Sequence, residues 1–150
     1  MALEKSCFFL GHREADERLL PRLEQAIEEL IRTEQVGCFY VGGYGGFDRL
    51  AASALRRAKA RHPQITLMRM LVYPPKPGCT APPPGFDGFY CPEGLECVPK
   101  RCAIPRANRL MAAQCEYLIC YVAHSASNAG KILSYARSHT AIRIRNLAQI

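Results

Sequence analysis

The alternation of short apolar runs with longer amphipathic stretches constrains the fold of this chain more than any other feature of its sequence. The apolar runs, which we predict to be strands, are residues 6–10, 38–41, 65–72, 117–122 and 141–147. The stretches with hydrophobic residues at helical spacing are about 17–35, 47–61, about 103–115 and about 128–138. Strands joined by helices run parallel, because a helix returns the chain to the same end of the sheet, and helices then cover both faces. The pattern predicts an α/β fold, a Rossmann-like three-layer sandwich with a mainly parallel five-stranded sheet.

One segment interrupts this alternation of strands and helices. The chain has 150 residues, 49% of them hydrophobic, which is enough for one domain, 1–150, with a core of its own. Residues 73–96 hold seven of the eleven prolines, so we predict a long loop there. The GFDGFY stretch at 85–90 supplies aromatic residues that would anchor this loop.

The cellular compartment follows from what the chain lacks. No apolar run approaches the roughly 20 residues that span a bilayer, and the apolar stretch near the N-terminus is too short for a signal peptide. We therefore expect a cytoplasmic protein with no membrane contact.

The eight cysteines fit a reducing compartment. Those expected to lie in strands or late in a helix, as small buried hydrophobes, are Cys7, Cys38, Cys115 and Cys120. Those in the loop-rich region are Cys79, Cys91, Cys97 and Cys102. Because their spacing contains no CxxC pair, we expect free thiols, no metal site and no bound cofactor.

Charge is unevenly distributed along the chain. Residues 1–36 carry eight acidic and five basic side chains, whereas residues 37–150 carry five acidic and fifteen basic ones. The basic surplus suits an anionic partner, either a phosphate-bearing small molecule or a nucleic acid, although net charge also serves solubility alone.

A glycine-rich stretch separates the second predicted strand from the second predicted helix. It contains Gly42, Gly43, Gly45 and Gly46. Glycine permits positive φ and removes the Cβ, so backbone N–H groups at a helix start could cradle an anion; a tight turn is the alternative. Asp48 follows, either as a helix cap or as an acceptor for ribose hydroxyls.

Three other segments contribute candidate ligand-binding residues, because ligands of such folds bind beyond the carboxyl ends of the strands. These residues are Gly11, His12 and Arg13; Arg106, Asn108 and Arg109; and Ser125, Ser127, Asn128 and Gly130. Arginine can hold phosphate in bidentate fashion, and hydroxyl and amide groups at a helix start can add hydrogen bonds. The alternatives are a loop histidine satisfied by its neighbours, a solvated basic helix face and ordinary helix capping.

Several motifs in order resemble the SLOG superfamily, which unites DNA-processing protein A with the LONELY GUY phosphoribohydrolases. They are FFLGHR, FYVGGYGGFDRLAASALRRAK, VPKRCAIPRANRLMAAQCEYLICYV, ASNAGKILSYA and RIRNLA. The chain is most similar to the small stand-alone YpsA-like branch, and the similarity covers nearly the whole sequence. The resemblance implies a Rossmann-like fold and a nucleotide-type ligand at the strand ends.

The sequence departs from the hydrolase pattern at one point. Those enzymes carry a PGGxGTxxE motif after the fourth strand, and the matching stretch here, HSASNAGKILS, contains no acid. Cleavage of an N-glycosidic bond needs a carboxylate near the anomeric carbon, so Asp48, our candidate catalytic residue, or Asp87 would have to supply it. We therefore predict a nucleotide-binding protein. Nucleotide N-glycoside hydrolysis or transfer is the first alternative and single-stranded nucleic-acid binding the second, and homo-oligomerisation stays open.

Overall fold

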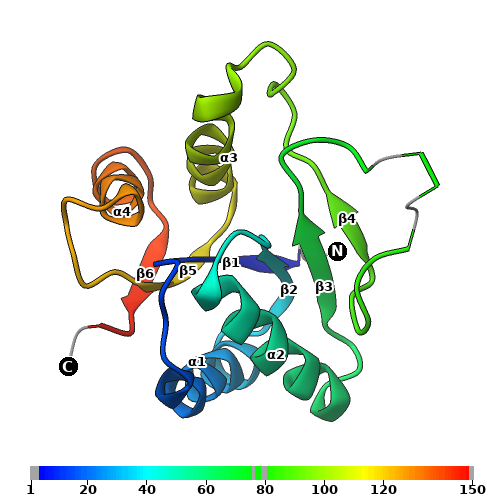
Figure 1. Cartoon of the computed structure of the whole chain (residues 1–150). Helices are drawn as coiled ribbons and strands as arrows, with labels where there is room; N and C mark the ends of the chain where they lie inside the picture. Colours follow the sequence, from blue (N-terminus) through cyan, green and yellow to red (C-terminus); the bar gives the residue numbers. More distant parts are fainter. Residues whose placement is uncertain (1–3, 76, 79–80, 149–150) are drawn as a thin grey trace.

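In the computed structural model, which describes residues 4–75, 77–78 and 81–148, parallel strands form a sheet in the order β4-β3-β2-β1-β5-β6 (Figure 1). The strands are β1 (Lys5–Gly11), β2 (Val36–Val41), β3 (Thr66–Met70), β4 (Gly88–Tyr90), β5 (Tyr117–Tyr121) and β6 (Arg143–Asn146). Each neighbouring pair is parallel. The predicted mainly parallel sheet is confirmed, with six strands in the described residues instead of five.

Two helices cover each face of the sheet, which confirms the three-layer sandwich (Figure 1). The helical elements are the 3₁₀ turn η1 (Glu17–Leu19), α1 (Leu20–Thr33), α2 (Gly46–Arg61), α3 (Lys100–Gln114) and α4 (Asn128–His139). Helices α1 and α2 lie on one face and α3 and α4 on the other. Pro21 falls at the start of α1, where a missing N–H costs little.

The central strand β1 shows why the apolar runs are continuous. Successive side chains of a strand point to opposite faces. Cys7 and Phe9 therefore pack with α1 and α2, while Phe8 and Leu10 pack with α3 and α4. Both faces are buried, so both sets of side chains are apolar.

The strand that the sequence did not predict, β4, lies inside the proline-rich segment. Backbone hydrogen bonds join the Asp87 N–H to the Leu67 carbonyl (2.8 Å) and the Leu71 N–H to the Tyr90 carbonyl (2.8 Å). The Asp87 carboxylate also accepts the Leu67 N–H (2.8 Å) and pairs with Lys59 (2.9 Å). The Leu67 N–H bond and Lys59 lower the pKa of Asp87 despite partial desolvation. Asp87 is thus a structural residue of the sheet edge.

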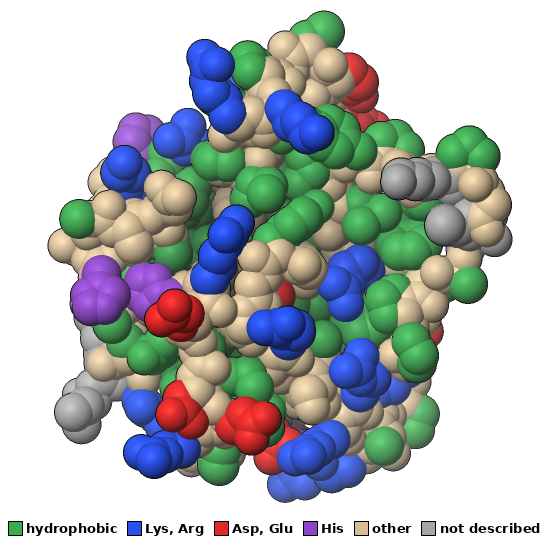
Figure 2. All heavy atoms as spheres, in the orientation of Figure 1, with side chains coloured by type: hydrophobic (Ala, Val, Ile, Leu, Met, Phe, Trp, Pro, Cys, Tyr) green, Lys and Arg blue, Asp and Glu red, His purple; other side chains and the backbone are tan. Residues whose placement is uncertain are grey.

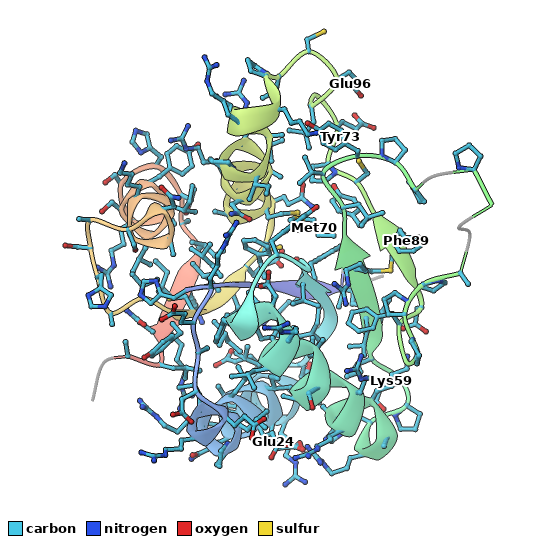
Figure 3. The ribbon with its side chains drawn as sticks, viewed as in Figure 1. Glu24, Lys59, Met70, Tyr73, Phe89 and Glu96 are labelled. Carbon is cyan, nitrogen blue, oxygen red and sulfur yellow. The ribbon has the colours of Figure 1, made fainter. Side chains whose placement is uncertain are left out.

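The aromatic residues of this segment anchor it, as expected. Phe86 is buried under α2, beside the Arg69 guanidinium (5.3 Å to the ring centre). Tyr90 packs edge-on against Tyr40 of β2, with ring centres 5.1 Å apart. Phe89 lies on β4, on the outer edge of the sheet (Figure 3).

The cysteines in described positions carry free thiols. Cys7, Cys38, Cys115 and Cys120 are buried, as predicted, and burial raises the pKa of each. Cys79 lies outside the described residues.

Within the described ranges, no helix has the length and apolar character that crossing a membrane would require.

Candidate functional site

A cavity of about 400 Å³ opens at the carboxyl ends of β1 and β2, between the starts of α2 and α4 and one side of α3. From β1 the chain adds β2, β3 and β4 in turn towards one edge of the sheet. It then returns and adds β5 on the other flank of β1, followed by β6. The cavity thus lies beside the point where strand order reverses, the usual ligand position in open α/β sheets.

Nine of the fifteen predicted ligand-binding residues line this cavity. They are Gly11, His12, Arg13, Gly42, Gly45, Asp48, Asn108, Ser127 and Asn128. The six that do not line it are Gly43, Gly46, Arg106, Arg109, Ser125 and Gly130. The structure therefore brings together at least one residue from each of the predicted segments.

The loop after β1 is fixed by its backbone. The His12 N–H donates to the Tyr121 carbonyl (3.3 Å), and the His12 carbonyl accepts the Phe47 N–H (3.3 Å). A Cβ at Gly11 would collide with the Phe47 ring, so glycine is required for α2 to pack against this loop. Arg13 follows, with its exposed side chain at the cavity wall.

The His12 ring ties the same loop to the segment before α4. Its Nε2 accepts the Ala123 N–H (2.8 Å), so the neutral ring carries its proton on Nδ1. Burial, and then the neighbouring His124 ring at 5.4 Å, lower the pKa of His12. The histidine is thus satisfied by its neighbours while it also faces the cavity.

The glycine-rich stretch makes room for protein backbone. The Gly46 N–H donates to the Arg13 carbonyl (2.7 Å), and a Cβ at Gly46 would collide with that same oxygen. A Cβ at Gly45 would lie 3.0 Å from the Arg13 Cα. Positive φ plays no part, because the described glycines with positive φ lie elsewhere, at residues 78, 85 and 94. The loop after β1 therefore occupies much of the space predicted for an anion at the start of α2.

Behind this stretch lies Arg69, whose Nη1 donates to the Gly42 carbonyl (3.3 Å). A Cβ at Gly43 would collide with the same Nη1. The Arg69 Nε is buried and has no hydrogen-bond partner among the described residues. Burial lowers the pKa of Arg69, and the nearby Asp48 acts in the opposite direction.

Asp48 holds the turn before α2 and also faces the cavity, although α2 has no side-chain cap hydrogen bond at its N-cap, Gly45. Its Oδ2 accepts the Tyr44 N–H (3.0 Å), which holds the turn before α2, and the carboxylate lines the cavity. Burial raises the pKa of Asp48, while the Tyr44 N–H and Arg69 act against this rise. The Tyr44 hydroxyl in turn accepts the Val72 N–H (3.2 Å), which links the turn to the end of β3.

The start of α4 supplies backbone donors. Ser127 is the N-cap: its Oγ accepts the Gly130 N–H (3.0 Å) and donates to the His124 carbonyl (2.5 Å). The Lys131 N–H donates to the Ser127 carbonyl (3.0 Å). Of the first four N–H groups of this helix, those of Asn128 and Ala129 donate to no described residue, and both residues line the cavity.

Gly130 is required by close packing, because a Cβ there would collide with the Ser125 carbonyl oxygen. Two other predicted residues, both on α3, do not line the cavity. Arg106 is exposed, and the Arg109 guanidinium lies 5.5 Å from the centre of the Tyr135 ring on α4. Arg109 therefore joins the two helices outside the cavity.

Helix α3 begins at Lys100, three residues before the predicted start, so Arg106 lies in its second turn and Pro105 lies inside the helix. The cavity-lining residues of α3 are Arg101, Ile104, Pro105 and Asn108. Only Asn108 was predicted. The four residues have the spacing i, i+3, i+4, i+7, which places them on one side of the helix, but Arg101 lies before the predicted start of the helix at about residue 103.

Hydrophobic side chains flank the opening. Tyr44 and Ile104 are 39% and 37% exposed, and with Tyr73 they are the large hydrophobic side chains left exposed among the described residues. Figure 2 shows hydrophobic side chains grouped on this face, with cations around them. Met70, at the end of β3, lines the cavity from within and lies between β3 and α3 in Figure 3. The site thus offers apolar surface, the cations Arg13 and Arg101, and one carboxylate.

No group of three His, Cys, Asp or Glu side chains in the described residues could hold a metal ion.

No protein-family model matches the chain, and a search of the curated proteins found no match. What the cavity binds must therefore be inferred from its own geometry and charge.

Proposed function

We propose that the cavity beside β1 binds a nucleotide or a nucleotide derivative. One observation carries this proposal: the cavity at the switch point of the sheet is lined both by the unused N–H groups at the start of α4 and by Arg13. Helix N-termini attract anions through their free N–H groups and their partial positive charge. The volume of about 400 Å³ falls within the roughly 300–1,000 Å³ of small-molecule sites.

The cavity lining offers two kinds of chemistry. Asn128 and Ala129 offer N–H donors to a phosphate group, and Arg13 adds charge-assisted hydrogen bonds. Tyr44 and Ile104 offer apolar surface to a planar ring, which would explain why both side chains are left exposed in the free protein. Asp48 lies at the cavity wall, where its carboxylate can accept hydrogen bonds from ribose hydroxyls.

The resemblance to the SLOG superfamily and its YpsA-like branch supports the same ligand class, and we propose membership on the motifs described above. A cytoplasmic location is part of this proposal.

The experiment is calorimetric titration with nucleoside monophosphates and with the matching nucleosides. If the phosphate binds as proposed, each monophosphate should bind more tightly than its nucleoside, and Arg13→Ala should reduce that difference. Arg137→Ala is the matched control, because Arg137 is an exposed arginine in the last turn of α4, at the opposite end of that helix. Equal affinity for nucleosides and monophosphates in the wild type would rule out the phosphate site.

A second candidate function, single-stranded nucleic-acid binding, has its own supporting observation. Helices α3 and α4 contain no Asp or Glu. Their lysines and arginines, all exposed, are Lys100, Arg101, Arg106, Arg109, Lys131 and Arg137. The opposite face pairs its charges, for example Arg57 with Glu24 (2.9 Å) and Arg61 with Glu28 (3.0 Å).

Salt dependence separates the two candidates. A nucleic acid bound along α3 and α4 should lose affinity with a log–log slope of about −0.7 for each phosphate neutralised. A single nucleotide in the cavity should show a shallower loss. Tight single-stranded DNA binding at physiological salt that is abolished by Arg106→Ala together with Arg109→Ala would favour the nucleic-acid function.

A further inference from the structure

Helix α3 presents one face to the cavity, and that face contains a proline. Arg101, Ile104, Pro105 and Asn108 line the cavity at the spacing that places side chains on one side of a helix. Pro105 lies inside the helix, five residues after its first residue, Lys100. Proline within a helix lowers helix stability, so its position beside a cavity needs an explanation.

The proline changes the hydrogen bonding of this wall. In an α-helix the carbonyl of residue 101 accepts the N–H of residue 105. Pro105 has no N–H, and inside a helix a proline ring crowds the carbonyl of the residue four positions earlier. Arg101 and Pro105 both line the cavity, so the carbonyl that lacks its usual helical partner belongs to a residue of this wall.

We propose that the Arg101 carbonyl, freed by Pro105, accepts a hydrogen bond from an exocyclic amino group on the base of the bound nucleotide. This proposal rests on the proposed nucleotide site and specifies its ligand: a base of the adenine or cytosine type is preferred over its oxo counterpart. Residues Arg101 and Pro105 thereby determine base specificity.

The neighbouring side chains fit this role. Ile104 and the Pro105 ring offer apolar surface to the flat side of a base, and Ile104 is 37% exposed in the free protein. The Asn108 amide, one turn further along the same face, can donate to a ring nitrogen and accept from an amino group. An oxo group in place of the amino group would set an oxygen against the Arg101 carbonyl, with no hydrogen between them.

The test compares pairs of nucleotides in which the base carries either an amino group or an oxo group at the same position. Calorimetric titrations of the wild-type protein with AMP and IMP, and with CMP and UMP, should show the amino form binding about tenfold more tightly in at least one pair. Pro105→Ala and Pro105→Ser each restore an N–H for the Arg101 carbonyl while keeping helix-compatible residues. In both variants the ratio should fall toward one.

Pro21→Ala is the matched control, because Pro21 is an exposed proline at the start of α1, where its missing N–H leaves no carbonyl unpaired. It should keep the wild-type ratio. Equal binding of amino and oxo forms by the wild type, or an unchanged ratio in both Pro105 variants, would overturn the proposal.

Titrations with adenosine and inosine separate this proposal from the one on which it rests. If adenosine binds as tightly as AMP but still more tightly than inosine, the phosphate site fails while base recognition by α3 stands. If AMP and IMP both bind more tightly than their nucleosides but equally to each other, the phosphate site stands and base recognition by Arg101 fails.

Discussion

Acidification should loosen the cavity by protonating His12. The neutral ring accepts the Ala123 N–H through Nε2 (2.8 Å), and a doubly protonated ring cannot accept it. The pKa of His12 is lowered in the folded protein, by burial first and by His124 second. The unfolded chain therefore takes up this proton at higher pH than the folded protein does, starting near the ordinary pKa of about 6.5.

The contribution of His12 to the free energy of unfolding is present in full above pH of about 6.5 and is lost as the pH falls through the lower, folded-state pKa. Its size is that of one neutral hydrogen bond, about 1 kcal/mol. Because this bond positions the segment before α4, ligand affinity should fall over the same interval of pH.

The assay is urea unfolding of the wild type and of His12→Gln between pH 5 and 8. The glutamine amide oxygen can replace Nε2 as an acceptor but does not titrate, so the difference between the two proteins isolates the histidine. We expect the wild type to lose about 1 kcal/mol more than the variant on acidification. Parallel curves for the two proteins across the whole range would refute the reasoning. His124→Ala should raise the folded-state pKa of His12, because it removes a neighbour that lowers this pKa, and the loss should then be complete at higher pH than in the wild type.

Gly46→Ala should lower the free energy of unfolding by about 1–3 kcal/mol, because its Cβ would collide with the Arg13 carbonyl oxygen, and an unchanged urea midpoint would contradict this close packing. Ser127→Ala should cost about 1 kcal/mol through loss of the N-cap bond to the Gly130 N–H and should weaken nucleotide binding; a variant with wild-type stability would show that the cap contributes little. We expect no release of free base from a nucleoside monophosphate, as measured by chromatography. If release is observed, Asp48→Asn should lower kcat more than it weakens binding, and unchanged turnover would leave Asp48 only its bond to the Tyr44 N–H.

The parallel sheet could be predicted from the sequence because both faces of its central strands are buried. In β1 this gives an unbroken apolar run, and the helix that must follow each parallel strand has its own spacing signal. The short edge strand β4 could not be predicted in the same way. It has three residues, all half-buried, and its pairing depends on hydrogen bonds between Asp87 and Leu67, which are twenty residues apart.

The candidate site was predicted in outline because it gathers at strand ends, where fold topology places ligands. The reason for the glycines before α2 could not be predicted from the sequence, since it depends on how closely the loop after β1 packs against the start of that helix. Only the structure shows that Gly46 meets the Arg13 carbonyl and that Gly43 meets Arg69. On α3 only Asn108 was predicted, and Arg101 was missed because the helix begins at Lys100, before its predicted start at about residue 103.

The measurement that tests the central claim most directly is a titration of ¹⁵N-labelled protein with a nucleoside monophosphate, followed residue by residue in amide NMR spectra. If the phosphate binds at the start of α4, the amide signals of Asn128 and Ala129 should shift most, and far less with the matching nucleoside. Shifts confined to α1, α2 or the outer strand β6, with Asn128 and Ala129 unchanged, would contradict the proposed site.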